Sequence, residues 1–250
     1  MSLDIYIGYD PREEEAFDVC AYSIERRASI PVQIHALSKF NPLYTRKEFL
    51  KDGIRYDAID GKPFSTDFSF ARFLVPDLMD HEGTALFVDC DFLFLADVAE
   101  LLKFAHAAHA VSVVMHNHVP LEDRKWGGHI QARYARKNWS SLVLWNCGHK
   151  ANKALTASVV NSESGSWLHG FEWLTPHQIG SLPMAWNHLV GYSRAVDVDK
   201  LRAVHFTTGG PWFKEFENVP YAGAWFAERE AMCRQRPHRE KRIVELNART

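Results

Sequence analysis

The chain has 250 residues, 46% of them hydrophobic, which is enough for one large domain with a substantial core. Its formal net charge is -2 and its pI is near 6.7, so the charge balance gives no indication of nucleic acid or an anionic membrane as the main partner. The four cysteines are scattered without a Cys-x-x-Cys pair, as is typical of reduced thiols. We therefore expect a cytoplasmic protein without a signal peptide or a membrane span, and peripheral contact with a membrane stays open.

The first forty residues predict a strand, a helix and a second strand. Residues 3–8 alternate apolar and polar side chains, as a strand does. Asp10 is a suitable N-cap and Pro11 a suitable first helical residue, and the helix should end before Pro31. Residues 31–37 supply the next strand. Strand, helix and strand in this order indicate a βαβ unit and a mostly parallel sheet.

The turn formed by Gly8, Tyr9 and Asp10 should lie at the carboxyl end of the first strand. Ligands of open α/β sheets collect at this edge, so a nucleotide could bind there. Asp10 is equally explained as a helix cap and nothing more.

Residues 38–63 are polar and contain several glycines, so we expect a loop. Residues 67–75 predict a helix that Pro76 ends. Arg72 lies among aromatic and aliphatic neighbours, which is unusual for a solvated arginine. It either extends its charged end to water or offers its planar group of donors to a phosphate.

Residues 85–95 form an apolar run that is interrupted only by Asp89, Cys90 and Asp91. Carboxylates are almost never fully buried unless they are paired or bound to a metal. A bend at Cys90 would turn both aspartates outward at the carboxyl end of a central strand. Two oxygen ligands there suit Mg²⁺ or Mn²⁺ bridging to a diphosphate, although aspartates also cap turns between short strands.

The remaining elements follow from the same patterns. They are a capped helix over 97–102, strands over 111–115, 140–145 and 203–206, a helix over 150–160, a long basic loop over 116–139 with a hinge at Gly127 and Gly128, and a charged C-terminal tail.

Taken in order, these motifs resemble the retaining glycosyltransferases of family eight, which have the GT-A fold and use nucleotide sugars. The family has an arginine on a short helix, matched by Arg72, and an aspartate-any-aspartate motif after a hydrophobic strand, matched by Asp89 and Asp91. Near its end the family has a histidine in a strand, followed by glycine and Pro-Trp. The matching residues here are His205, Gly209, Pro211 and Trp212.

The resemblance implies a metal site and a donor site. Asp89, Asp91 and His205 would hold Mn²⁺ or Mg²⁺ against the diphosphate of a UDP-hexose, with Asp91 also counted as catalytic. A lone histidine in an apolar strand is otherwise usually a packed core residue. Gln178 would face the donor sugar as the second catalytic residue. The expected donor-binding residues are Gly8, Tyr9, Asp10, Arg72, Asp89, Cys90, Ser140, Ser141, Asn187, Gly209, Trp212 and Lys214.

Two positions depart from the family. Gly210 replaces the lysine that precedes Pro-Trp, for which Lys214 could substitute, and the family's Asp-Gln-Asp stretch is represented at best by His177, Gln178 and Ile179.

The resemblance implies one Rossmann-like GT-A domain over 1–250, with a mostly parallel sheet flanked by helices. Its parts would be nucleotide-binding (1–115), acceptor- and sugar-binding (116–215) and a helical tail (216–250). The expected reaction moves a hexose from UDP-glucose or UDP-galactose to a glycan or lipid-linked acceptor. The alternatives are a non-catalytic nucleotide-sugar-binding relic and a metal-dependent nucleotidyltransferase or phosphohydrolase. The sequence is silent on oligomeric state.

Overall fold

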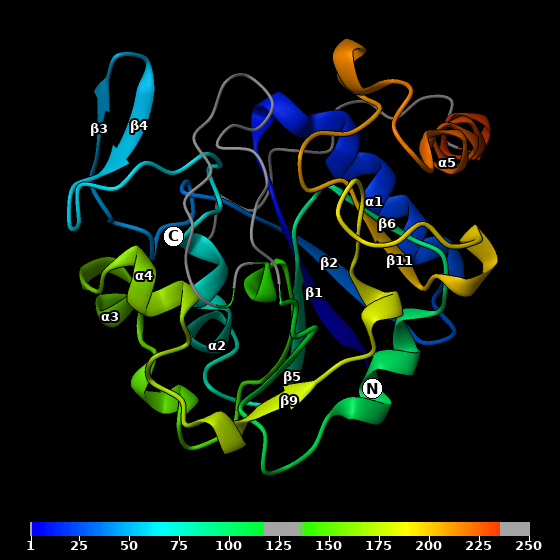
Figure 1. Cartoon of the computed structure of the whole chain (residues 1–250). Coiled ribbons are helices and arrows are strands. Elements are labelled where there is room, and N and C mark those ends of the chain that lie inside the picture. Colours follow the sequence, from blue (N-terminus) through cyan, green and yellow to red (C-terminus); the bar gives the residue numbers. More distant parts are fainter. Residues whose placement is uncertain (1, 118–135, 137, 236–250) are drawn as a thin grey trace.

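The computed structural model describes residues 2–117, 136 and 138–235, which form an α/β domain around a six-stranded sheet (Figure 1). The strand order is β2-β1-β5-β8-β7-β9. The pairs β1–β2, β1–β5 and β7–β9 are parallel, whereas β5–β8 and β7–β8 are antiparallel. The predicted α/β fold with a mostly parallel central sheet is confirmed. The strands are β1 (Leu3–Gly8), β2 (Val32–Leu37), β5 (Thr84–Val88), β7 (Val111–Val113), β8 (Leu142–Asn146) and β9 (Ile179–Ser181).

Helices cover both sides of this sheet. In Figure 1, α1 and α5 lie to one side, and α2, α3 and α4 lie to the other. No helix in the described part of the chain is both long and apolar enough to cross a membrane. The α-helices are α1 (Glu14–Arg27), α2 (Val75–Leu78), α3 (Ala157–Ser162), α4 (Gly165–His169) and α5 (Ala222–Gln235). The short 3₁₀ helices are η1 (Pro11–Glu13), η2 (Ala71–Leu74), η3 (Val98–Phe104), η5 (Trp139–Ser141), η6 (Asn152–Ala154), η7 (Pro176–Gln178), η8 (Met184–Trp186), η9 (Val198–Lys200) and η10 (Lys214–Phe216).

The predicted βαβ unit is confirmed as β1, η1 with α1, and β2. Asp10 is the N-cap, and its carboxylate accepts a hydrogen bond from the Arg12 amide at 3.0 Å. The helix continues from η1 into α1, whose buried face includes Val19, Cys20 and Ile24. This buried face packs the helix against both β1 and the strand that follows Cys90.

The predicted central strand is divided by the bend expected at Cys90. β5 ends at Val88, and β6 (Phe92–Phe94) belongs to a second sheet with the order β10-β11-β6. The other two strands are β10 (His188–Leu189) and β11 (Ala203–His205). The chain therefore passes from one sheet to the other between Asp89 and Asp91, which places both carboxylates where the two sheets meet.

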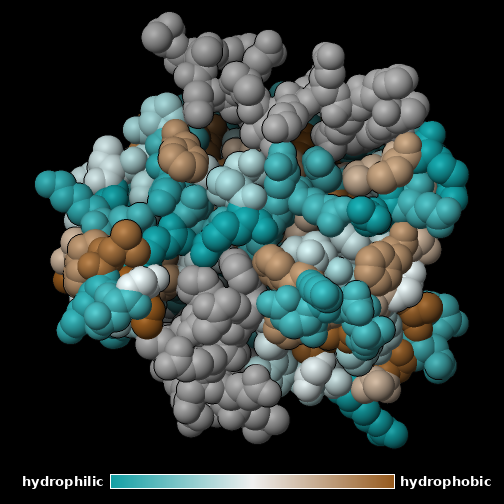
Figure 2. Space-filling view, turned by 90° about the horizontal axis from the view of Figure 1, so that it is seen from above, coloured by the Kyte–Doolittle hydropathy of each residue, from teal (hydrophilic) through white to brown (hydrophobic). Residues whose placement is uncertain are grey.

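The prediction of a plain loop over 38–63 is wrong, because the segment contains a β-hairpin. β3 (Glu48–Lys51) pairs antiparallel with β4 (Ile54–Asp57). All four residues of β3 are exposed, so the strand has no apolar alternation to detect. Asp52 and Gly53 have φ values of 52° and 74° and supply the Asp-Gly turn signal that could have revealed it. Figure 1 shows the hairpin projecting from the domain, and Figure 2 shows hydrophobic surface on the same side.

Three other predicted boundaries are wrong. Pro76 lies in the first turn of α2 instead of ending a helix, because proline tolerates that position well. Ser140 and Ser141 belong to η5, which precedes the strand that we expected to start with them. The helix predicted over 150–160 is divided into η6 and α3, with Thr156 as the N-cap of α3.

The C-terminal part of the described chain is the helix α5, which packs against the rest of the domain. Trp225 of α5 is 1% exposed, and Glu228 forms an ion pair with Arg27 of α1 at 2.7 Å. Helix α5 therefore docks on α1. The predicted hinge at Gly127 and Gly128 and the charged end after 235 lie outside the described residues.

Candidate functional site

The site lies in the turn between β5 and β6. The Asp89 amide donates to the Ser141 carbonyl at 2.9 Å, and the Phe206 amide donates to the Asp91 carbonyl at 2.9 Å. Cys90 is fully buried, and its thiol lies 3.9 Å from a Glu13 carboxylate oxygen. The turn is thus held from three sides, and the Cys90 side chain is directed into the core instead of toward a ligand.

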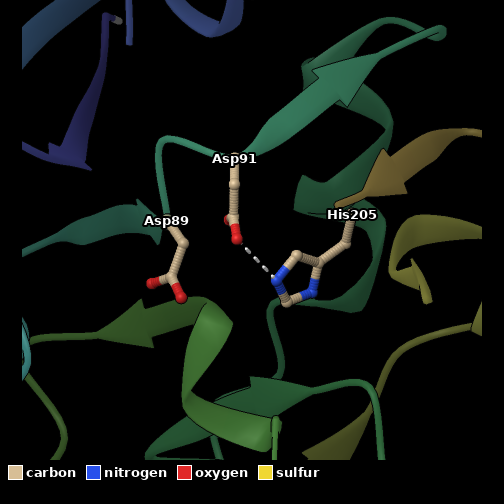
Figure 3. Close-up of side chains that lie close together, drawn as sticks. All are labelled: Asp89, Asp91 and His205. Carbon is tan, nitrogen blue, oxygen red and sulfur yellow. Dashed lines mark ion pairs between the residues drawn. The ribbon is translucent and has the colours of Figure 1, made fainter. Parts of the chain in front are cut away.

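Asp89, Asp91 and His205 form a cluster that could hold a metal ion (Figure 3). Their ligand atoms all lie within 4.8 Å of one another. Nε2 of His205 lies 3.3 Å from Oδ2 of Asp91. Two carboxylates and one imidazole suit Mn²⁺ better than Mg²⁺, which favours sites made entirely of oxygen ligands. The structure thus brings the three sequence-predicted ligands together, from the β5–β6 turn and from β11.

Arg72 is occupied by protein groups. Its guanidinium lies 2.8 Å from Oδ1 of Asp89 and donates to the carbonyls of Ser140 at 2.9 Å and Ser69 at 3.1 Å. The guanidinium also lies over the rings of two phenylalanines, Phe68 and Phe87. These contacts account for the burial of Arg72 without a phosphate. Its position beside Asp89 nevertheless makes it part of the site.

His205 is held by a chain of hydrogen bonds. Its Nδ1 lies 2.9 Å from Oδ1 of Asn187, and the side-chain nitrogen Nδ2 of Asn187 donates to Oγ of Ser141 at 2.9 Å. The Ser141 hydroxyl donates in turn to the carbonyl of Asn138 at 2.7 Å. The ring also stacks on Phe92, with centroids 4.3 Å apart. Asn187 and Ser141, which we expected at the donor site, thus lie directly behind a candidate ligand.

Two residues near the site escaped the sequence analysis. His169 of α4 lies with Nδ1 2.8 Å from Oγ of Ser140, and its ring contacts Phe73. Asn138 is in the left-handed region with φ of 65° and supplies the carbonyl that Ser141 reaches. Neither residue belongs to a periodic pattern, so the sequence carries no signal for its position.

The turn after β1 is packed tightly. A Cβ on Gly8 would lie 2.5 Å from the Phe68 ring, so only glycine fits there.

Asp10 is 1% exposed and accepts hydrogen bonds from Arg12 and from the Asp67 amide. Burial alone would raise the pKa of Asp10, but these bonds hold it below the ordinary aspartate value. The helix-cap interpretation of Asp10 is confirmed. Half-buried Tyr9 packs edge-on against Phe17.

The turn after β11 is shaped by packing. Gly209 has φ of 146°, and a Cβ there would lie 2.7 Å from the Phe216 ring. Trp212 packs against Phe206 and Trp225, with ring centroids 5.9 Å and 5.6 Å away. Lys214 is exposed at the start of η10. All three residues lie within nine positions after His205, so this turn leads away from the candidate metal ligand.

The structure does not bring Gln178 to this site. Through β7 and β8, Ile179 is level with Ala85 near the start of β5, and Gln178 precedes it. Asp89 lies beyond the other end of β5, roughly 16 Å along the strand at about 3.3 Å per residue. The Gln178 side chain instead accepts a hydrogen bond from the Thr175 amide in the capping box of η7. The expectation of a donor-facing Gln178 is therefore corrected to that of a capping residue.

Comparison with known proteins places this geometry in context. No family model matches the chain. Protein CDI of Arabidopsis thaliana is 45% identical over 229 residues, which are 90% of this chain and 85% of that protein.

Solved glycosyltransferase structures share the fold. The galactosyltransferase LgtC, solved with donor and acceptor sugar analogs, matches with a TM-score of 0.58 and 14% identity over 92% of this chain and 96% of its own. GlyE of Streptococcus pneumoniae TIGR4 matches with a TM-score of 0.59, 16% identity and 94% of this chain. The bifunctional enzyme WbbM matches with a TM-score of 0.58, 14% identity and 91% of this chain. The chain spans 63% of the GlyE chain and 51% of the WbbM chain. At these identities the likeness establishes the GT-A fold.

Proposed function

The chain belongs to the family of protein CDI of Arabidopsis thaliana, and from this premise we propose that it is a metal-dependent glycosyltransferase. One observation carries the proposal: Asp89, Asp91 and His205 converge within 4.8 Å at the point where β5 ends. The likeness of the fold to glycosyltransferases with bound donor and acceptor analogs supports it. The proposed donor is a UDP-hexose, UDP-glucose or UDP-galactose, and the proposed acceptor is a glycan or lipid-linked sugar.

Each ligand residue has a defined task in this proposal. When bound, a divalent cation supplies the positive charge that stabilises a departing nucleoside diphosphate. Asp89 and Asp91 would bind this cation through their carboxylates. Arg72 fixes the Asp89 carboxylate through a 2.8 Å ion pair. His205 presents Nε2 toward the carboxylate of Asp91. The resemblance to family eight extends the proposal to transfer with retention at the anomeric carbon.

The donor would contact the walls around this cluster. We place it between the turn at Tyr9, η5 at Ser140 and the turn at Gly209, because all three lie next to the ends of β1, β5 or β11. Half-buried Trp212 packs against Trp225 and would support the last turn, whereas exposed Lys214 would take the place of the missing lysine at the phosphates.

The test is product analysis with UDP-glucose and UDP-galactose in the presence of Mn²⁺. A glycosyltransferase without acceptor releases UDP and free hexose slowly, because water replaces the acceptor. We expect this hydrolysis to need Mn²⁺ and to be lost in Asp91→Asn, while Asp197→Asn, at an exposed site with a 77% exposed side chain, retains it.

Other products would contradict the proposal. Release of UMP and hexose phosphate would show cleavage within the diphosphate and a phosphohydrolase. Mn²⁺-dependent binding of UDP-hexose without turnover, with or without glycan acceptors, would indicate a nucleotide-sugar-binding relic.

A further inference from the structure

We infer that Asn187 is a positioning residue that fixes the His205 imidazole with its proton on Nδ1, which leaves the lone pair of Nε2 facing the metal site. This inference deepens the proposed function and rests on it for the assignment of His205 as a metal ligand. It changes the expected role of Asn187 from a donor-sugar contact to a support for a metal ligand.

The hydrogen bonds determine which way the Asn187 amide faces. Asn187 is 0% exposed, and its amide nitrogen lies 2.9 Å from Oγ of Ser141 and 3.4 Å from the carbonyl of Asn138. That carbonyl can only accept, and the Ser141 hydroxyl already donates to it at 2.7 Å. The nitrogen of Asn187 must therefore face this pair, and its oxygen Oδ1 must face His205.

The position of the proton on His205 follows from this orientation. Oδ1 of Asn187 has no proton to give, so Nδ1 of His205, 2.9 Å away, must donate. In the neutral imidazole Nε2 is then an acceptor. Nε2 lies 3.3 Å from Oδ2 of Asp91, which is also an acceptor, so the two atoms require a cation or a proton between them. The pair is arranged as a metal-ligand pair would be.

The ring has little freedom to leave this position. His205 is 2% exposed and stacks on Phe92 at an interplanar angle of 21°. Asn187 precedes β10, and His205 ends β11, which pairs with both β10 and β6. The small sheet thus fixes the position of His205 relative to Asn187. Such supports of a metal-binding histidine typically change metal affinity by about 10- to 100-fold when they are removed.

The first test reads the proton directly in the wild-type protein without metal. In ¹⁵N-histidine-labelled protein at neutral pH, with His205→Gln used to assign the signal, we expect His205 to carry its proton on Nδ1. A His205 ring with its proton on Nε2 and none on Nδ1 would overturn the inference, whether or not the protein binds metal, whereas a proton on Nε2 in addition to the one on Nδ1 is the arrangement that Asp91 favours when no metal is bound.

The second test measures binding of Mn²⁺ alone by electron paramagnetic resonance. Asn187→Leu removes the acceptor for Nδ1, and we expect it to weaken Mn²⁺ binding by about tenfold or more. Asn187→Asp restores an acceptor oxygen, and the Ser141 hydroxyl can rotate to face it, so most of the wild-type affinity should return. Folding of each variant is checked by circular dichroism.

The outcomes separate this inference from the proposed function. Wild-type affinity in a folded Asn187→Leu variant would contradict the positioning role. Equal loss in Asn187→Leu and Asn187→Asp would also contradict it, because the acceptor oxygen would then not matter. Absence of Mn²⁺ binding in the wild type would defeat the metal-dependent function, and the nitrogen spectra would still decide the placement of the proton.

Discussion

Replacing Arg72 by methionine should destabilise the fold, and the structure sets the size of the effect. The Arg72–Asp89 ion pair is 2.8 Å long, and its side chains are only 8% and 14% exposed. Removing one partner of a buried pair costs about 3–5 kcal/mol, because the remaining charge loses that counter-charge. The carbonyls of Ser69 and Ser140 also lose a donor.

We expect the lower end of that range, about 3 kcal/mol, because Asp89 keeps some access to water and methionine fills the space between Phe68 and Phe87. For a chain of this size the melting temperature should fall by roughly 6–12 °C. The assays are urea denaturation for the free energy of unfolding and thermal denaturation for the melting temperature, both monitored by tryptophan fluorescence.

The matched control is Arg202→Met. Arg202 pairs with Glu100 at 3.4 Å, but the two side chains are 48% and 34% exposed. Exposed pairs contribute at most about 1 kcal/mol, so this variant should be close to the wild type. If Arg72→Met lost no more stability than Arg202→Met, the reasoning from the buried pair would be refuted.

Three further changes have defined outcomes. Gly209→Ala should lose about 1–3 kcal/mol of unfolding free energy, because its φ is 146° and the new Cβ would lie 2.7 Å from the Phe216 ring. Gly223→Ala in α5 meets nothing within 4 Å and should not destabilise; equal losses in denaturation would contradict the account. Asp10 has a lowered pKa, so its contribution to stability is present above the unfolded value of 3.8 and lost as pH falls through the lowered one. Asp10→Asn should therefore flatten the acid side of the stability–pH curve, and an unchanged slope would exclude this role. His205→Ala should abolish most Mn²⁺-dependent turnover in a protein that stays folded by circular dichroism, and near-normal turnover would make His205 an ordinary core residue.

The sequence predicted the parts of the fold that rest on local chemistry. The Asp10 cap, the strands on either side of α1 and the bend at Cys90 depend on near neighbours in the chain, and the structure confirms them. The hairpin over β3 and β4 was missed because its first strand is wholly exposed and buries no stripe of apolar side chains.

The candidate ligands could be predicted from the sequence, whereas the residues that support them could not. Asp89, Asp91 and His205 stand out because carboxylates and a histidine interrupt apolar strands. The partners of Arg72 and the Asn187–His205 contact depend on how β10, β11 and η5 come together, which no spacing in the sequence reveals. Gln178 was misplaced because a short match of residue types says nothing about the end of the sheet at which a turn lies.

The central claim is that a divalent cation held by Asp89, Asp91 and His205 joins the protein to a nucleoside diphosphate. Calorimetric titration of UDP into the wild-type protein, with Mn²⁺ and then with excess chelator, tests it most directly. We predict binding with Mn²⁺, no measurable binding with chelator, and loss of the Mn²⁺ effect in Asp91→Asn. Equal UDP affinity with Mn²⁺ and with chelator would contradict the account.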